Sequence, residues 1–115
     1  MLKGLGGLGD MGKMMKAAQE MQGKMAQLQQ DLETMTVEGQ SGAGLVKATA
    51  TAKGTLTGLD IDPSIFSAED KEVVEDLILA AIKDVQTRAQ ERTRDEMGKL
   101  AESMGLPRDM NLPNF

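Results

Sequence analysis

Apolar residues recur at alternating intervals of three and four along the first third of the chain. This spacing places the side chains on one face of an α-helix, in the pattern of a heptad seam. The positions are Met11, Met14, Ala18, Met21, Met25, Leu28, Leu32 and Met35. We therefore predict a long helix that begins near Met11, with Asp10 as its N-cap, after a flexible glycine-rich arm over residues 1–9.

The pattern changes at Thr36 to one that is typical of β-strands. TVEGQ can form a short strand, SGAG a turn, and LVKATATA alternates between apolar and polar residues. The alternation places one set of side chains on each face of a strand, with Val46, Ala48, Ala50 and Ala52 opposite Lys47, Thr49, Thr51 and Lys53. Lys53-Gly54 suits a tight turn into a third strand, TLTGLDI, which Asp62-Pro63 ends. We expect a three-stranded antiparallel sheet whose alanine face is covered by a helix or by a second chain.

A second long helix is predicted after the sheet. Ser67 and Asp70 have the spacing of a capping box. An apolar stripe follows and continues more weakly to Met104; its members are Val74, Ile78, Ile82, Val85 and Ala89. Gly105 and the prolines after it predict a flexible tail over residues 105–115. The chain is thus predicted to be α+β, with one domain over residues 10–104.

Composition narrows the classes of function. The chain has ten Met, two Phe and neither Trp nor Tyr, so its apolar surface is flexible and a large solitary core is difficult to build. We therefore expect an obligate oligomer. Cys and His are absent as well, which removes thiol nucleophiles, imidazole bases and the common zinc ligands. We predict no catalytic residues, no metal, no cofactor, no small-molecule substrate, no membrane span and a cytoplasmic location.

Charge is distributed unevenly along the chain, whose net charge is −5. Residues 1–30 carry four Lys and two carboxylates, whereas residues 60–84 carry eight carboxylates and two Lys. Any binding of nucleic acid must therefore depend on local basic patches and not on the total charge.

The order of elements and several short motifs together resemble the YbaB/EbfC family of bacterial nucleoid-associated proteins. The resemblance covers nearly the whole chain, and the most informative segments are SGAGLVKATATAKGTLTGLDIDPSIF and EDKEVVEDLILAAIKDVQ. It includes the Gly/Met opening, the turn and strand at Gly42, Gly44, Leu45 and Val46, and the Ile61-Asp62-Pro63 stop. Within the second segment it rests on Glu75, Asp76, Leu77, Ala80, Ala81 and Asp84.

The resemblance implies a homodimer with a central β-region, from which long helices project like the arms of tweezers. It also implies that the protein binds DNA and is associated with the nucleoid, where it can affect nucleoid organisation and gene expression. The family has no short motif for reading bases, so the candidate contacts follow from charge.

The candidate DNA-binding residues are Lys13, Lys16, Lys24, Arg88, Arg92 and Arg94. The three lysines lie off the heptad seam and can reach phosphates, but they can equally be solubilising residues near Glu20. The arginines allow two interpretations as well. They can contact phosphates, or they can pair along the helix as Asp84 with Arg88, Glu91 with Arg94, and Arg92 with Glu96, beside Asp95 with Lys99. Lys47 and Lys53 on the polar strand face allow the same two interpretations, contact with phosphates or an ordinary solubilising role. Because aromatic residues are scarce, duplex DNA is a better candidate than a single strand.

Apolar residues at regular spacing are expected to pack helices together or to join two chains. The candidates are Met14, Met21, Met25, Leu28, Val46, Ala48 and Ala50. The methionine seam also fits a different function, that of a coiled-coil chaperone or adaptor that holds protein clients between helices. Binding of unfolded polypeptide without binding of DNA would favour this alternative.

Overall fold

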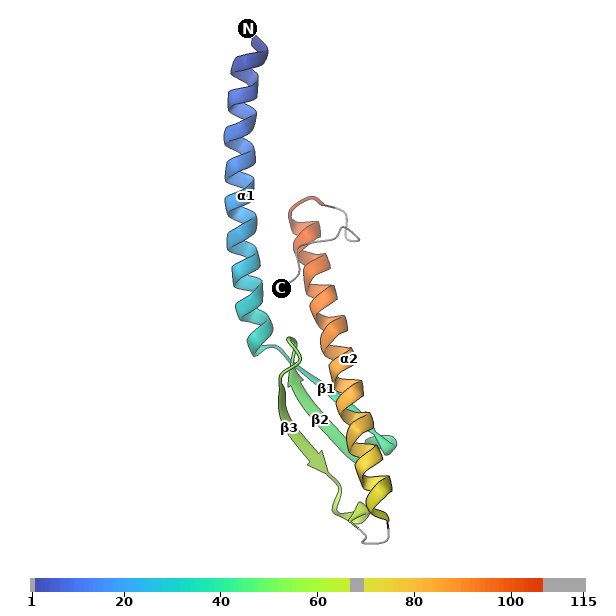
Figure 1. The fold of residues 1–115 in the computed structure, drawn as a ribbon. Helices are drawn as coiled ribbons and strands as arrows, with labels where there is room; N and C mark the ends of the chain where they lie inside the picture. The colour runs from blue at the N-terminus through green and yellow to red at the C-terminus, as the bar shows by residue number, and fades with distance from the viewer. Residues whose placement is uncertain (1, 67–69, 107–115) are drawn as a thin grey trace.

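Two long helices and a three-stranded sheet make up the structure (Figure 1), a computed structural model that describes residues 2–66 and 70–106. Helix α1 spans Leu2–Thr34 and leads into strands β1 (Thr36–Ser41), β2 (Val46–Thr51) and β3 (Leu56–Ile61). Helix α2 spans Lys71–Ser103. Short 3-10 turns lie at Gly42–Gly44 and Pro63–Ile65. The predicted fold class, helix, three-stranded antiparallel sheet and long helix, is confirmed.

The sheet has the order β1-β2-β3, and both neighbouring pairs are antiparallel. The turn between β1 and β2 has positive φ at Gly42, Ala43 and Gly44. Gly42 and Gly44 adopt this conformation without steric cost, whereas Ala43 is a non-glycine residue in the left-handed region. Between Thr49 and Ala50 the pairing of β2 with β3 shifts by a residue. Because β3 is an edge strand, its outer backbone groups lack a strand partner among the described residues.

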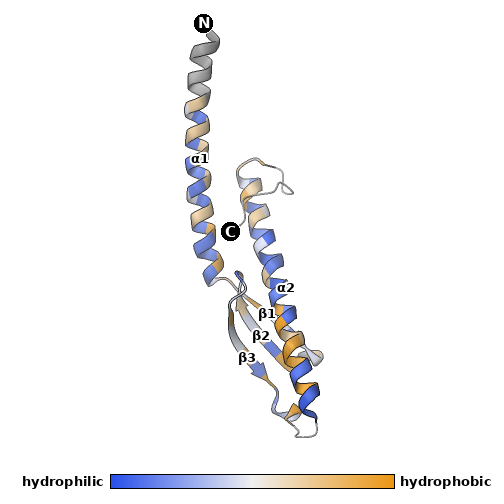
Figure 2. Cartoon of the chain, in the orientation of Figure 1, coloured by the Kyte–Doolittle hydropathy of each residue, from blue (hydrophilic) through white to orange (hydrophobic). Residues whose placement is uncertain are grey.

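The main core lies between the sheet and the first half of α2, which crosses β1 and β2. Val46, Ala48 and Ala50 have no exposed surface, and they pack with Ala81 and Val85 of α2. The alternation predicted for β2 is therefore confirmed, and a helix of the same chain covers the alanine face. Figure 2 shows the strongest hydrophobic colour on α2 where it lies beside this sheet.

The closest approach of α2 to the sheet occurs at Gly39 in β1. A Cβ atom at this position would lie 2.3 Å from the backbone nitrogen of Val85 and 2.6 Å from its Cα. Glycine at position 39 is therefore a requirement of the packing between β1 and α2.

A smaller cluster joins both helices to the tip of the β2–β3 hairpin. Leu28 and Leu32 of α1 pack with Ala52, and Met97 and Leu100 of α2 complete the cluster. The Ala52 backbone N–H donates to the carbonyl oxygen of Met35 (2.9 Å), and the Thr93 hydroxyl donates to the carbonyl oxygen of Ala52 (2.7 Å). This cluster, Leu28, Leu32, Ala52, Met97 and Leu100, is called the joint below.

Helix α1 continues well beyond the joint, so that the molecule measures 83 × 21 × 16 Å. Every described side chain from Met11 to Glu20 is exposed. None of the helices in the part of the chain that is described is long and apolar enough to cross a membrane.

The ends of the helices differ from the prediction. Helix α1 begins at Leu2 and not near Met11, so Asp10 lies inside the helix and is not its N-cap, and residues 2–9 are helical and do not form a separate arm. Glycine weakens a helix without removing a backbone hydrogen bond, which is why the glycine-rich stretch can remain helical. Helix α2 begins at Lys71, while Ser67 and residues 107–115 of the predicted tail lie outside the described residues.

Candidate nucleic-acid interface

Three lysines and Glu20 form an exposed strip along the projecting part of α1, and this strip has a net charge of +2. Lys13, Lys16 and Lys24 lie within about 80° of one another around the helix axis and span roughly 16 Å along it. We call this strip the lysine face. Within the described part of the chain no ion pair joins Glu20 to Lys16 or Lys24, although both spacings would permit one. The three ammonium groups are therefore available to an external anion.

The arginines of α2 have a different environment, because two of the three have carboxylate partners on the same helix. Arg88 Nε lies 3.1 Å from Asp84 Oδ2, and Arg92 Nε lies 3.1 Å from Glu96 Oε1. These are pairs that the self-satisfied interpretation of the helix predicted.

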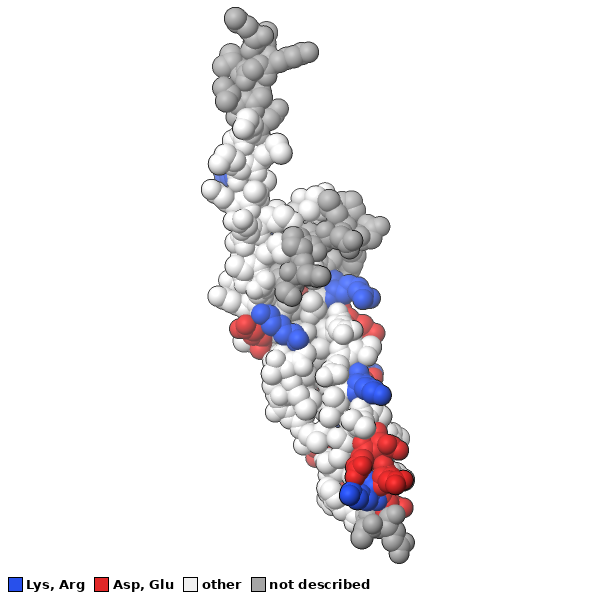
Figure 3. All heavy atoms as spheres, in the orientation of Figure 1, with Lys and Arg blue, Asp and Glu red and all other residues white. Residues whose placement is uncertain are grey.

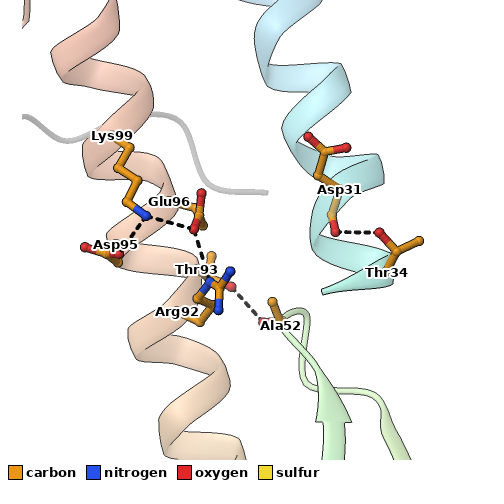
Figure 4. Close-up of polar contacts among 8 residues, drawn as sticks. All are labelled: Asp31, Thr34, Ala52, Arg92, Thr93, Asp95, Glu96 and Lys99. Atoms are coloured by element: carbon orange, nitrogen blue, oxygen red, sulfur yellow. Dashed lines mark hydrogen bonds and ion pairs between the residues drawn. The ribbon is translucent and has the colours of Figure 1, made fainter. Parts of the chain in front are cut away.

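A small network extends the pair at Arg92 (Figure 4). Lys99 Nζ lies 3.4 Å from Glu96 Oε1 and 3.5 Å from Asp95 Oδ2. The Glu96 side chain is only 13% exposed, so this network differs from a fully exposed ion pair, which contributes about 0–1 kcal/mol to stability. To bind Arg92, phosphate oxygens must replace a partly buried carboxylate.

Arg94 is exposed and has no ion pair with Glu91 or with any other residue in the ranges described. It also lies about 120° around the helix from Arg88 and about 160° from Arg92. The three arginines therefore do not form a single patch, although they are close in sequence. This separation follows from the helical geometry of α2.

Asp84 connects α2 to the edge of the sheet. Its Oδ2 atom accepts a hydrogen bond from the backbone N–H of Gln40 (2.9 Å) and another from Arg88 Nε (3.1 Å). The hydrogen bond from Gln40, followed by that from Arg88, lowers the pKa of Asp84 below its ordinary value. Sequence alone did not reveal this contact, because Gln40 and Asp84 are 44 residues apart.

The remaining cations of the sheet and of α2 fall into two groups. Lys53 Nζ lies 3.2 Å from Glu33 Oε1, and Lys71 Nζ lies 3.7 Å from Glu75 Oε1. Lys47 and Lys83 are exposed, and the described residues include no ion pair of either one. Lys83 was not predicted as a DNA-binding candidate, because it lies in a sequence segment, residues 60–84, that is strongly acidic.

The two ends of the molecule differ in charge. Figure 3 shows carboxylates gathered at the end of the molecule opposite the tip of α1, where Glu72, Glu75 and Asp76 lie in the first turns of α2. The lysine face lies on α1, beyond the joint. An extended anion therefore meets lower repulsion along α1 than along the beginning of α2.

The candidate packing residues are found in three environments. Met14 is 70% exposed, Met21 and Met25 are half-buried, and Leu28 is buried in the joint. Val46, Ala48 and Ala50 lie in the core of the chain itself. The heptad pattern correctly defines one face of α1. Helix α2 packs on the C-terminal part of that face and ends at Ser103.

No group of His, Cys, Asp or Glu residues that could hold a metal ion is found within the described ranges. The arrangement can instead attract anions by charge. Its exposed ammonium and guanidinium groups suit the phosphates of a nucleic acid, which accept such contacts without regard to base sequence.

Comparison with known proteins agrees with this interpretation. The model of the YbaB/EbfC DNA-binding family matches residues 7–104. A nucleoid-associated protein of Agrobacterium fabrum is 40% identical over 100 residues, which cover 87% of this chain and 94% of the relative. A nucleoid-associated protein of Methylocella silvestris is 41% identical, and one of Rhodospirillum rubrum 40%, with the same coverage.

The fold is also similar to a solved structure. The crystal structure of an uncharacterized protein from Helicobacter pylori aligns with a TM-score of 0.57 and 25% sequence identity. The alignment covers 69% of this chain and 92% of the other.

Proposed function

We propose that this chain, which belongs to the YbaB/EbfC DNA-binding family, binds duplex DNA as a homodimer, mainly through phosphate contacts. The observation that carries the proposal is the lysine face of α1, where three exposed ammonium groups have no ion pair within the described residues. In the nucleoid, such binding would affect nucleoid organisation and gene expression.

The spacing of the lysine face suits the backbone of a duplex. Phosphates along one DNA strand are separated by 3.4 Å along the axis, so the span of roughly 16 Å corresponds to about five successive phosphates. A helix that lies along a groove can therefore bring Lys13, Lys16 and Lys24 to separate phosphates. Contacts of this type set position and affinity and carry no base specificity.

The basic residues of α2 are expected to contribute unequally. Arg94 can bind a phosphate without giving up a carboxylate, whereas Arg88 and Arg92 must exchange Asp84 and Glu96 for the DNA. An exchange of one anion for another gains less than a new contact. We therefore rank the lysine face first, Arg94 second, and Arg88 and Arg92 last.

Net charge opposes binding at long range and makes it sensitive to salt. Each chain carries −5, so a homodimer carries −10. The absence of Trp and Tyr leaves few rings on which unpaired bases can stack, which favours a duplex over a single strand.

The test is a salt titration of binding to a labelled random duplex, followed by fluorescence anisotropy. Changing Lys13, Lys16 and Lys24 together to Gln should weaken binding and reduce the slope of log K against log salt by about 3 for each chain engaged, because each phosphate contact contributes about 0.9. The matched control changes Lys53, Lys71 and Lys99 to Gln, which removes the same charge from lysines that have carboxylate partners.

Equal slopes for the two triple variants would contradict a special role of the lysine face. If the unaltered protein does not bind the duplex even at low salt, the proposal fails. The exposed methionines of α1 would then favour the chaperone or adaptor alternative, which suppression of light scattering from an aggregating polypeptide tests directly.

A further inference from the structure

Helix α2 carries a second cationic surface, on the side of the helix that faces away from the sheet. Its members are exposed and lie within about 60° of one another around the helix axis. They are Lys83, Thr87, Gln90 and Arg94. We call this surface the outer face, because it lies on the side of α2 opposite to the residues that pack in the core.

Both cations of the outer face are available to an external anion. Lys83 and Arg94 have no ion pair among the residues that the structure describes. Asp84, the carboxylate next to Lys83 in sequence, already accepts hydrogen bonds from a backbone N–H of β1 and from Arg88. Glu91 lies about 60° from Arg94 around the helix. A phosphate can therefore approach the outer face without displacing a carboxylate.

The outer face has the same length as the lysine face. Lys13 and Lys24 are 11 residues apart in the sequence, and so are Lys83 and Arg94. Eleven residues are about three turns of helix, or roughly 16 Å, which corresponds to about five successive phosphates of one DNA strand. Exposed hydroxyl and amide groups between Lys83 and Arg94 add neutral hydrogen-bond donors. The outer face therefore fits a phosphate backbone, with two cations in place of three.

The lysine face and the outer face point in opposite directions. On α1 the lysine face lies about 95° around the axis from the side that contacts α2, which is formed by Leu28 and Leu32. On α2 the outer face lies about 80° from the side that contacts α1, formed by Met97 and Leu100. Both helices are right-handed and they run in opposite directions (Figure 1). These rotations therefore place the two surfaces on opposite sides of the plane that contains both helix axes.

We infer that the outer face of α2 binds a second duplex, so that a protein whose lysine face holds one segment of DNA bridges it to another. The inference rests on the proposed function. The body of the chain, which measures 21 × 16 Å across its shorter axes, lies between the two surfaces, so a straight duplex cannot contact both. Bridging of this kind draws separate segments of a long DNA molecule together.

The second duplex is held less tightly than the first. The outer face has two cations, and Asp76 lies on the same side of α2 about two turns before Lys83, which ends the cationic surface there. With fewer phosphate contacts, the second duplex is released first as the salt concentration rises. Bridging is therefore a property of low salt, whereas binding of a single duplex persists to higher salt.

Co-capture of two duplexes measures bridging by the full chain. A biotin-labelled duplex on beads, with the protein at low salt, should retain a fluorescent duplex from solution. Lys83→Glu should lower this retention at least about fivefold, because it reverses one of the two charges that hold the second duplex. Its Kd for a single duplex, measured by fluorescence anisotropy, should stay within about twofold of the parent value, since the lysine face is unchanged.

Lys71→Glu is the matched control. It makes the same change of charge on the same helix, but Lys71 lies about 120° from Lys83 around the axis and already pairs with Glu75. Its retention of the second duplex should equal that of the parent. Gln90→Lys makes the opposite change, because it adds a third cation between Lys83 and Arg94. It should raise retention at least about threefold and extend bridging to higher salt.

Two results would overturn the inference and leave the proposed function standing. One is a protein that binds a single duplex in the anisotropy measurement but retains no second duplex. The other is equal retention by Lys83→Glu and the parent, or no gain by Gln90→Lys, which would assign any bridging to another surface. If anisotropy detects no binding of a single duplex at low salt, the proposed function and this inference fail together. Circular dichroism checks that all three variants remain helical.

Discussion

Helices α1 and α2 have the same length, 33 residues each, yet they obtain their stability in different ways. Helix α2 lies over the sheet and buries Ala81, Val85 and Ala89. Helix α1 contacts the rest of the chain mainly at its C-terminal end, through Leu28 and Leu32. A periodic apolar face thus defines what a helix can bury, while the neighbouring elements decide how much of it is buried.

The largest expected effect concerns the contact between α2 and the sheet. Gly39→Ala should lower the free energy of unfolding by about 3 kcal/mol, because the new methyl group overlaps backbone atoms of Val85 that cannot turn away. Urea denaturation measures the change. Gly12→Ala on α1 is the matched control, and it should leave stability unchanged or raise it by up to about 1 kcal/mol, since its methyl group meets nothing within 4 Å. Similar losses in the two variants would show that α1 and α2 are equally packed.

Within α1, the two ends of one apolar face should respond differently. Leu32→Ala is expected to cost about 2–3 kcal/mol, because Leu32 has no exposed surface and its removal leaves a cavity in the joint. Met14→Ala should change the stability of a single copy by less than about 0.5 kcal/mol. The measurement is urea denaturation at a protein concentration below that of self-association. A large cost at Met14 under those conditions would mean that another part of the same chain covers it.

The smallest expected effect concerns how the free energy of unfolding changes at acid pH. The pKa of Asp84 is lower in the folded chain than in the unfolded chain, chiefly because of the hydrogen bond from Gln40. Its contribution is therefore present above the unfolded pKa and is lost as the pH falls through the folded value. Asp84→Asn should be less stable than the parent near pH 7, and the difference should shrink below about pH 4.

Asp76→Asn, which removes a negative charge from the same helix, controls for net charge in this titration. Thermal unfolding followed by circular dichroism between pH 2 and 7 measures both variants. A constant difference between Asp84→Asn and the parent across this range would contradict the linkage.

Sequence patterns predicted the elements of this fold well, for physical reasons that can be named. The alternation from Val46 to Lys53 has a period of two, which only an extended strand turns into one buried and one exposed face. Pairing of Arg88 with Asp84 and of Arg92 with Glu96 could be predicted as well, because spacing along a helix is local.

Features that depend on tertiary contact could not be predicted in this way. The pairing of the Gln40 N–H with Asp84 joins residues far apart in the chain, and the requirement for Gly39 appears only when α2 lies on the sheet. The start of α1 at Leu2 was not predicted, because a glycine-rich stretch looks the same in the sequence whether it forms a flexible loop or a weak helix. Heptad spacing likewise could not distinguish Met14 from Leu32, although one is exposed and the other buried.

The joint also has a mechanical consequence. Helix α1 is held near its C-terminal end, over the short stretch from Leu28 to Met35, which directly follows the helix. This stretch is about 10 Å long, while Met11 lies roughly 25 Å from Leu28 along the helix. As a lever, this geometry multiplies movement, so that a displacement of 1 Å across the joint moves the far turn of the helix by about 2–3 Å. The pivot of this lever lies at Ala52, whose backbone is hydrogen-bonded to Met35 and to Thr93 of α2. Small changes in packing at the hairpin tip would thereby displace Lys13 and Lys16 more than Lys24, which lies about one turn from Leu28.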